Sequence, residues 1–184
     1  MSKGILGVIV AIVIMAAMFF SSYNGLVSMN ENVTGKWSQV ENQLQHRNDL
    51  IPNLVNTVKG YAAHETEVFK AVSDARAKLG GAKTVAETTA ANNEMNSALS
   101  RLLVVAENYP DLKSNTNFQQ LQDELAGTEN RIAVARKDYN DAVQVYNAKI
   151  KSLPTSLYAG AFGFTAKDYF KADAAAQKVP QVKF

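Results

Sequence analysis

The sequence predicts an all-α protein, in which an N-terminal transmembrane helix is followed by an elongated antiparallel helical bundle with coiled-coil-like seams. Three observations predict this fold class. The run Gly4–Phe20 is apolar throughout, and no charged residue occurs between Lys3 and Glu31. Strong helix breakers are few after this run, and the segments between them are rich in Ala, Leu, Gln, Glu and Lys. Apolar residues recur in these segments at helical spacing, and no stretch indicates a strand.

Residues 1–30 are predicted to form a transmembrane anchor and a juxtamembrane segment. A helix needs about 20 apolar residues to cross the hydrocarbon core of a bilayer, and Gly4–Tyr23 supplies them, with Tyr23 where an interfacial aromatic residue would lie. A cleaved signal peptide is the alternative, but its apolar core would span about 7–15 residues before a small-x-small cleavage site, which residues 18–23 do not provide. The residues expected to span the membrane include Ile5, Leu6, Val8, Ile9, Val10, Ile12, Val13, Ile14, Phe19 and Phe20.

The charges that flank the anchor predict its orientation. Lys3 and the α-amino group lie on the short arm, whereas the other flank begins with Glu31, Lys36 and Glu41. This lysine bias favours a cytoplasmic N-terminus, with the C-terminal domain outside the cytoplasm. The 19 Lys and Arg residues include Lys3, so 18 basic residues face 17 acidic ones beyond the anchor. That balance argues against nucleic acid as a partner.

Residues 31–153 are predicted to form the antiparallel bundle. Its first segment, from about Leu26 to Leu79, contains Pro52 and is either one kinked helix or two helices, with Asp49 capping the second. Beyond Pro52, apolar residues about 3.5 positions apart predict a seam, a line along which helices pack. The residues of this first seam are Ile51, Val55, Val58, Ala62, Phe69, Val72 and Leu79.

Two further helices are predicted. Thr84 and Glu87 have the spacing of a capping box, and the helix that they open stops before Pro110. The third segment, from about Asn115 to Leu153, alternates apolar residues in steps of four and three, as coiled-coil packing requires. Short connections between helices of this length favour antiparallel neighbours. The residues of the third-segment seam are Leu121, Leu125, Thr128, Ile132, Ala135, Tyr139, Ala142 and Tyr146.

Residues 154–184 form an aromatic-rich tail. Its bulky residues Leu157, Tyr158, Phe162, Phe164, Tyr169 and Phe170 lie in an otherwise small, glycine-containing stretch. Thr165–Asp168 has the composition to cap a short last helix. We expect the tail to pack on the bundle and complete its core, or to offer a surface to a neighbouring subunit or to the membrane interface.

The sequence offers little chemistry for catalysis or metal binding. His46 and His64 are its only histidines, and it has no cysteine. Neither histidine belongs to a pair spaced to place two metal ligands on one helical face, and there is no glycine-rich phosphate loop or nucleophile elbow. We therefore expect no catalytic residue, no cofactor, no metal ion and no enzymatic activity.

Several polar residues lie within or beside the predicted seams. Glu65 and Arg76 fall on the first seam, and Glu129, Arg131, Arg136, Tyr139 and Asn140 crowd the third segment. Such residues are expected to form interhelical ion pairs or to face water, and a polar seam residue can fix the register of the helices. The alternative is a buried polar cluster that binds a ligand.

Several blocks of the sequence match a known family. They are Arg47–Val55, Val58–Tyr61 with His64-Glu65, Tyr109–Leu112 with Asn117-Phe118 and Leu121, Glu129–Ala133 with Ala135-Arg136, Tyr139-Asn140, Val143 and Tyr146-Asn147, and finally Pro154, Phe162–Phe164 and Tyr169-Phe170. On these blocks, the stretch from Trp37 to Phe170 resembles the LemA family of bacterial membrane-anchored proteins. The usual arginine pair is His46-Arg47 here, which puts any role of the first arginine in doubt.

The resemblance implies an N-terminal transmembrane segment, an antiparallel helical bundle, the bacterial cytoplasmic membrane as location and no established enzymatic activity. Some relatives are linked to membrane-associated assemblies, including organelle biogenesis in magnetic bacteria. We single out as interaction or structural positions Arg47, Asp49, Pro52, Asn53, Glu65, Glu129, Arg131, Arg136, Tyr139, Asn140, Phe162, Phe164, Tyr169 and Phe170.

The leading hypothesis for function is a non-enzymatic, single-pass membrane scaffold that contacts lipid and associates with itself to organise or shape the membrane. An adaptor or regulatory subunit that docks on another membrane protein is the alternative, with Arg47, Asp49, Glu129 and Arg136 as its surface. A metal-dependent hydrolase would rest on His64, Glu65 and neighbouring carboxylates alone.

Overall fold

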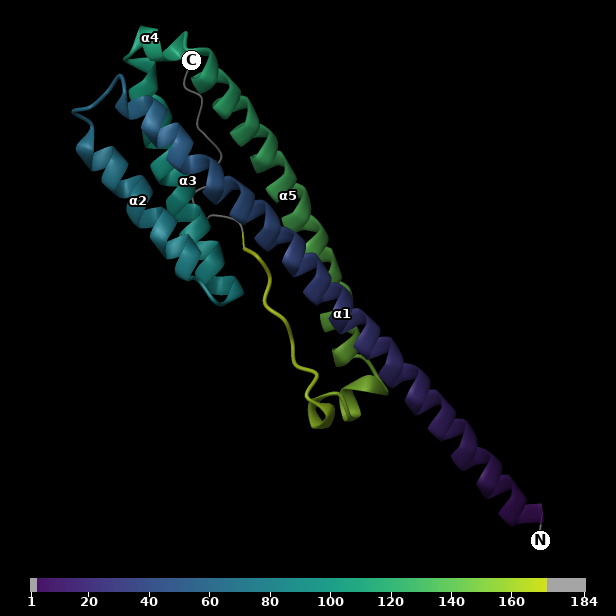
Figure 1. The fold of residues 1–184 in the computed structure, drawn as a ribbon. Coiled ribbons are helices and arrows are strands. Elements are labelled where there is room, and N and C mark those ends of the chain that lie inside the picture. The colour runs from purple at the N-terminus through teal and green to yellow at the C-terminus, as the bar shows by residue number, and fades with distance from the viewer. Residues whose placement is uncertain (1–2, 172–184) are drawn as a thin grey trace, which may run out of the picture. The chain divides into compact units, whose positions relative to one another are not determined.

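The computed structural model describes residues 3–171, which are mostly helical and contain no strand. The predicted all-α fold class is therefore confirmed. The helices are α1 (Lys3–Lys59), α2 (Thr66–Gly81), α3 (Val85–Glu107), α4 (Pro110–Lys113) and α5 (Thr116–Lys151), followed by the 3₁₀ turns η1 (Thr155–Leu157) and η2 (Gly160–Phe162) (Figure 1).

Of the two alternatives for the first segment, a second helix capped by Asp49 is wrong, because α1 continues through Pro52 as one helix to Lys59, and the next helix begins only at Thr66. A proline inside a helix lacks the N–H that would bond the carbonyl four residues earlier, which here belongs to Asn48. Arg76 Nε of α2 donates to this carbonyl oxygen at 3.3 Å and so replaces the missing donor. Asp49 caps no helix, and its side chain instead accepts a hydrogen bond from Gln45 Nε2 at 2.8 Å.

The chain divides into two compact units, and both α1 and α5 contribute to each. The anchor unit comprises the described residues 3–38 and 138–167. The bundle unit comprises residues 39–137 and 168–171. The predicted division into residues 1–30, 31–153 and 154–184 stays a prediction.

The bundle unit has an apolar core that draws on every helix. Figure 1 shows α2 and α3 side by side, and a short connection joins them. The connection ends in the predicted capping box, in which Thr84 Oγ1 accepts from the Glu87 N–H at 3.2 Å and Glu87 Oε2 accepts from the Thr84 N–H at 3.1 Å. The core includes Ile51, Leu54, Val58, Phe69, Val72, Met95, Leu102, Leu112 and Phe118. Most residues of the first seam are therefore buried, as predicted.

Helix α5 closely matches the predicted third helix, and its seam residues from Thr128 to Tyr146 are buried. Of these, Tyr139, Ala142 and Tyr146 belong to the anchor unit, whose buried residues also include Leu26, Val33, Val143 and Ile150. The short helix predicted to start at Thr165–Asp168 is wrong, because this stretch has no helical structure. Asn147 holds it by two side-chain bonds at 2.9 Å, accepting from the Lys167 N–H and donating to the Lys167 carbonyl.

Candidate functional site

The first part of α1 presents a fully apolar and uncovered surface. Its side chains from Gly4 to Met18 are exposed, and the most apolar window is long enough to cross a membrane while none of it is buried within the protein. A helix in the core of a water-soluble domain would bury such side chains, since apolar burial is the main driving force of folding. This stretch is therefore suited to lipid as its surroundings.

An aromatic cluster lies at the end of this apolar stretch. It consists of Phe19 and Tyr23 of α1 with Tyr158, Phe162 and Phe164 from the chain after α5. Phe162 contacts both rings of α1, with centroid distances of 5.7 Å to Phe19 and 5.5 Å to Tyr23. Tyr158 lies 4.8 Å from Phe19, and Phe164 lies 5.6 Å from Tyr23. Residues far apart in the sequence thus form one aromatic contact in the anchor unit.

Hydroxyl groups support the aromatic cluster. The Tyr158 hydroxyl donates to Ser22 Oγ at 2.5 Å, and Ser22 Oγ lies 3.4 Å from Thr155 Oγ1. Hydroxyls that pair in this way leave few unsatisfied polar groups where water is scarce. The three residues fix η1 on α1 without any charge.

A hollow of about 560 Å³ lies along α1 beside the same region. Three small residues of α1, Ala17, Ser21 and Gly25, form part of its lining at intervals of four residues, together with Met18 and Lys149. A Cβ atom added at Gly25 would meet nothing within 4 Å among the described residues. Small residues at this spacing allow the backbone of a second helix to approach closely in a membrane.

The bundle unit holds a different kind of site, an arginine network at its centre. Arg47 of α1 is 1% exposed. Its guanidinium donates to Asn92 Oδ1 at 2.6 Å and Asn96 Oδ1 at 2.8 Å, both on α3, and forms an ion pair with Glu129 of α5 at 2.7 Å. Burial lowers the pKa of Arg47, and the carboxylate of Glu129 opposes this shift. The network therefore ties three helices together around one buried charge.

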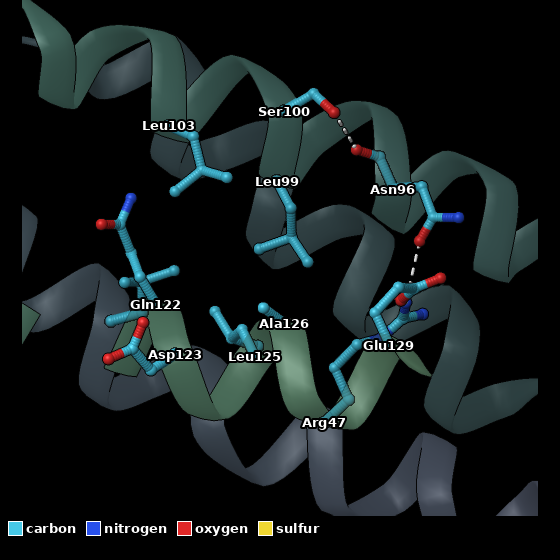
Figure 2. A pocket seen from close by; sticks show the side chains of 11 residues that line it. Arg47, Asn96, Leu99, Ser100, Leu103, Gln122, Asp123, Leu125, Ala126 and Glu129 are labelled. Carbon is cyan, nitrogen blue, oxygen red and sulfur yellow. Dashed lines mark hydrogen bonds and ion pairs between the residues drawn. The ribbon is translucent and has the colours of Figure 1, made fainter. Parts of the chain in front are cut away.

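A cavity of about 520 Å³ adjoins the arginine network. Figure 2 shows Leu99 and Leu103 of α3 pointing toward Leu125 and Ala126 of α5, with Arg47, Asn96 and Glu129 gathered at one end. The middle of the cavity is thus lined by apolar side chains, and polar side chains lie at both ends, with Gln122 and Asp123 opposite the arginine network.

Comparison with known proteins places this architecture in a family. The family model described as the LemA family matches residues 36–184. The chain belongs to the LemA family. Two relatives are the magnetosome proteins MamQ 1 and MamQ 2 of Paramagnetospirillum magneticum, each 29% identical over 192 residues, which cover 89% of this chain and 70% of the relative. The magnetosome protein MamQ of Magnetospirillum gryphiswaldense is 26% identical and covers 92% of this chain and 74% of its own length.

In the structure of this LemA-family protein, the polar residues singled out in the sequence lie in different places and contact different partners. Glu65 accepts a hydrogen bond from the Tyr109 hydroxyl at 3.4 Å. Exposed Arg131 donates to Glu124 at 2.7 Å and to Thr128 at 2.8 Å. Arg136 lies over the ring of buried Phe170 at 4.3 Å, and burial lowers its pKa while Glu129 opposes the shift.

The other positions lie in several places. Tyr139 is buried and its ring centroid is 5.1 Å from Trp37, whereas Asn140 is half-buried. Pro52 is half-buried inside α1, and Asn53 and Tyr169 are exposed. Some of the sequence-predicted positions thus contribute to the arginine network, the aromatic cluster or the packing around Phe170, the others make separate local contacts, and together they form no single site.

No group of three or more metal-ligating side chains converges anywhere in residues 3–171. His46 Nδ1 lies 3.3 Å from Thr128 Oγ1, and His64 is exposed. The absence of cofactors, metal ions and enzymatic activity stays a prediction.

Sequence reasoning missed the partners of Arg47. Asn92 and Asn96 lie one helical turn apart, so they face the same side of α3. Their spacing was available as a signal, because Asn92 falls on the apolar face that also carries Met95 and Leu99. Ser22 was missed as well, since its partner Tyr158 is 136 residues away along the chain.

Proposed function

We propose that this LemA-family protein is a non-enzymatic membrane scaffold, tethered by α1, that associates laterally with copies of itself and thereby organises or shapes the membrane. The observation that carries the proposal is the uncovered apolar stretch of α1, together with the hollow of small residues at its end. The protein would reside in the bacterial cytoplasmic membrane with its bundle unit outside the cytoplasm.

Lateral association is supported by the hollow beside Ala17, Ser21 and Gly25. Lipid tails are as apolar as leucine, so helices in a membrane associate mainly through close packing and hydrogen bonds. A stripe of small residues with an open space beside it allows such packing. Tethering to a shared plane also raises the effective concentration of the copies, so weak contacts suffice.

A scaffold is also supported by the way the polar groups are used. Arg47, Asn92, Asn96 and Glu129 bond to one another, so they fix the positions of helices. The relatives are named as magnetosome proteins, and we extend from them to this chain only a role as a component of an assembled structure.

The adaptor alternative loses the surface on which it was based. It required Arg47, Asp49, Glu129 and Arg136 to face a partner together. Arg47 is buried, Glu129 is half-exposed but pairs with it, and Arg136 is half-buried against Phe170, so Asp49 alone of the four is exposed without a part in these contacts. The scaffold is therefore the better-supported proposal.

Cysteine crosslinking in membranes tests the proposal, because the natural chain has no cysteine. Full-length variants Ala17→Cys and Ser21→Cys are oxidised in membranes, with Ala16→Cys as the matched control. Ala16 lies about 100° around the helix from Ala17, and a disulfide requires Cα atoms within about 7 Å. We expect dimers from Ala17→Cys and Ser21→Cys and few from Ala16→Cys. Equal crosslinking at all three positions, or none, would contradict packing through this face.

A further inference from the structure

The stretch from Ser152 to Ala166 has an unusual composition for a surface segment. It contains no charged residue, although it includes Tyr158, Phe162 and Phe164. Leu153 and Leu157 are 76% and 79% exposed, and Phe162 is 52% exposed. Large apolar side chains that stay exposed together mark an interaction surface.

The aromatic cluster sets the depth of this stretch relative to a bilayer. Gly4–Tyr23 is about 30 Å long at 1.5 Å per residue, which equals the hydrocarbon thickness of about 30 Å. Phe19 and Tyr23 therefore fall at the boundary between acyl chains and headgroups. Phe162 contacts both of these rings and Tyr158 contacts Phe19, so η1 and η2 lie at the same boundary.

The exposed leucines share this depth. Leu157 directly precedes Tyr158, and consecutive Cα atoms are about 3.8 Å apart. Leu153 lies just before η1, whose Thr155 is close to Ser22. In water the exposure of these side chains would be unfavourable, whereas an interfacial segment buries such side chains among acyl chains.

The charges around the stretch fit a lipid surface. Lys149 and Lys151 lie in the last turn of α5, directly before it. Lys149 also lines the hollow beside Met18 and Ser21, at the end of the apolar stretch of α1. Lysines near the end of a membrane span extend their ammonium groups toward the headgroups while their stems stay in apolar surroundings.

We propose that residues 153–162 form a second membrane contact, in which Leu153, Leu157 and Phe162 insert at the boundary between acyl chains and headgroups of the lipid bilayer. This inference rests on the placement of α1 across the bilayer that the proposed function also uses, but it is independent of self-association.

Depth-dependent quenching tests the contact on the full-length protein. An environment-sensitive fluorophore is attached to the thiol of Leu157→Cys, and the protein is placed in vesicles of phosphatidylcholine and phosphatidylglycerol. Some of the lipids carry a nitroxide quencher, either near the headgroup or deep in the acyl chain. Val13→Cys reports the middle of the span. Ser38→Cys is the control in the same unit, about 22 Å along α1 from Tyr23. Leu153→Cys provides a second reporter of the contact.

We expect shallow nitroxides to quench the fluorophores at Leu157 and Leu153, deep nitroxides to quench the one at Val13, and neither to quench the one at Ser38. Quenching at Val13 but not at Leu157 or Leu153 would overturn the second contact and leave the membrane anchor intact. No quenching at Val13 would overturn the placement of α1 and this inference with it. A blue-shifted but unquenched Leu157 would show that protein, and not lipid, covers the segment.

Discussion

The two units of this protein satisfy their apolar and polar groups in opposite ways. In the bundle unit, apolar side chains face inward from every helix, and a charge at the centre is held by Asn92, Asn96 and Glu129. In the anchor unit, large apolar side chains from Ile5 to Phe20 face outward, and the uncharged stretch 152–166 lies beside the end of that surface. The bundle unit is thus covered by a polar surface, whereas the apolar stretch of α1 is long and apolar enough to have lipid around it.

The polar contacts of the arginine network also differ from those at the end of the apolar stretch of α1. The bundle unit holds the buried guanidinium of Arg47 with two asparagine oxygens and the half-exposed carboxylate of Glu129. At the end of the apolar stretch of α1, the hydroxyls of Ser22, Thr155 and Tyr158 make the polar contacts. A hydroxyl is much cheaper than a charge to remove from water, so the choice of polar group follows the expected surroundings.

The largest effect is expected at the buried charge of the bundle unit. Arg47→Ala removes a fully buried side chain and leaves Asn92 and Asn96 without their shared donor, which should cost about 2–5 kcal/mol of folding free energy, although the half-exposed Glu129 can then be hydrated. The control Arg131→Ala removes an exposed arginine and should stay within about 0.5 kcal/mol. Urea unfolding of the full-length protein in nanodiscs, followed by circular dichroism, measures both. Equal midpoints for the two variants would show that the network does not stabilise the bundle.

Two valines with the same exposed fraction test whether lipid surrounds the apolar stretch of α1 while water surrounds the bundle unit. Val13 of the anchor and Val104 of α3 are both 61% exposed. Aspartate at the centre of a membrane span costs about 2.5–3.5 kcal/mol of insertion free energy, whereas a surface change on a water-soluble bundle costs about 0.5 kcal/mol or less. We expect Val13→Asp to lower the fraction of protein that sediments with membranes, and Val104→Asp to leave it unchanged. The same loss for both variants would contradict the comparison.

A smaller effect is expected where α1 passes through Pro52. Arg76→Ala removes the donor to the Asn48 carbonyl, and an intramolecular hydrogen bond contributes about 0.5–1.5 kcal/mol. In the Pro52→Ala background the helix supplies its own N–H to this carbonyl, so the same arginine substitution should cost less. A double-mutant cycle on urea midpoints measures the coupling. Additive effects would mean that Arg76 does not replace the missing donor.

The smallest expected effect is the pH dependence of stability that Glu87 of the α3 capping box contributes. Hydrogen bonds from the Lys83 and Thr84 N–H groups hold the pKa of Glu87 below its ordinary value, which is about 4.3. A carboxylate whose pKa is lowered in the folded state adds stability above its unfolded pKa and loses it as the pH falls through the folded pKa. Between pH 7 and pH 3 the wild type should therefore lose more stability than Glu87→Gln, which does not titrate. Parallel losses in urea midpoint would exclude this contribution.

The sequence predicted the elements whose signals are local. The Thr84–Glu87 spacing located the start of α3, and the apolar periodicity from Leu121 to Tyr146 located α5. Local rules left the outcome at Pro52 open and gave the wrong one at Thr165–Asp168. At Pro52 the helix continues and Arg76 donates to the Asn48 carbonyl, whereas Asn147 bonds the backbone of Lys167 where a helix cap was expected.

The candidate site was predictable only in part for the same reason. Arg47 and Phe162 were singled out from the sequence, but their partners could not be named. Asn92 and Asn96 meet Arg47 only when α3 packs on α1, and Phe19 and Tyr23 meet Phe162 only when the chain returns along α1 after α5. Such contacts depend on helix packing, which periodicity alone does not specify.

We propose that the membrane anchor assembles copies of this protein. The most direct test is the mass of the full-length protein in nanodiscs that are large enough to hold several copies, measured over a range of protein-to-lipid ratios. We expect discrete oligomers that persist at low protein-to-lipid ratios, and we expect Ala17→Leu to shift them toward the monomer while Ala16→Leu does not. A monomer at every protein-to-lipid ratio would contradict assembly through the anchor.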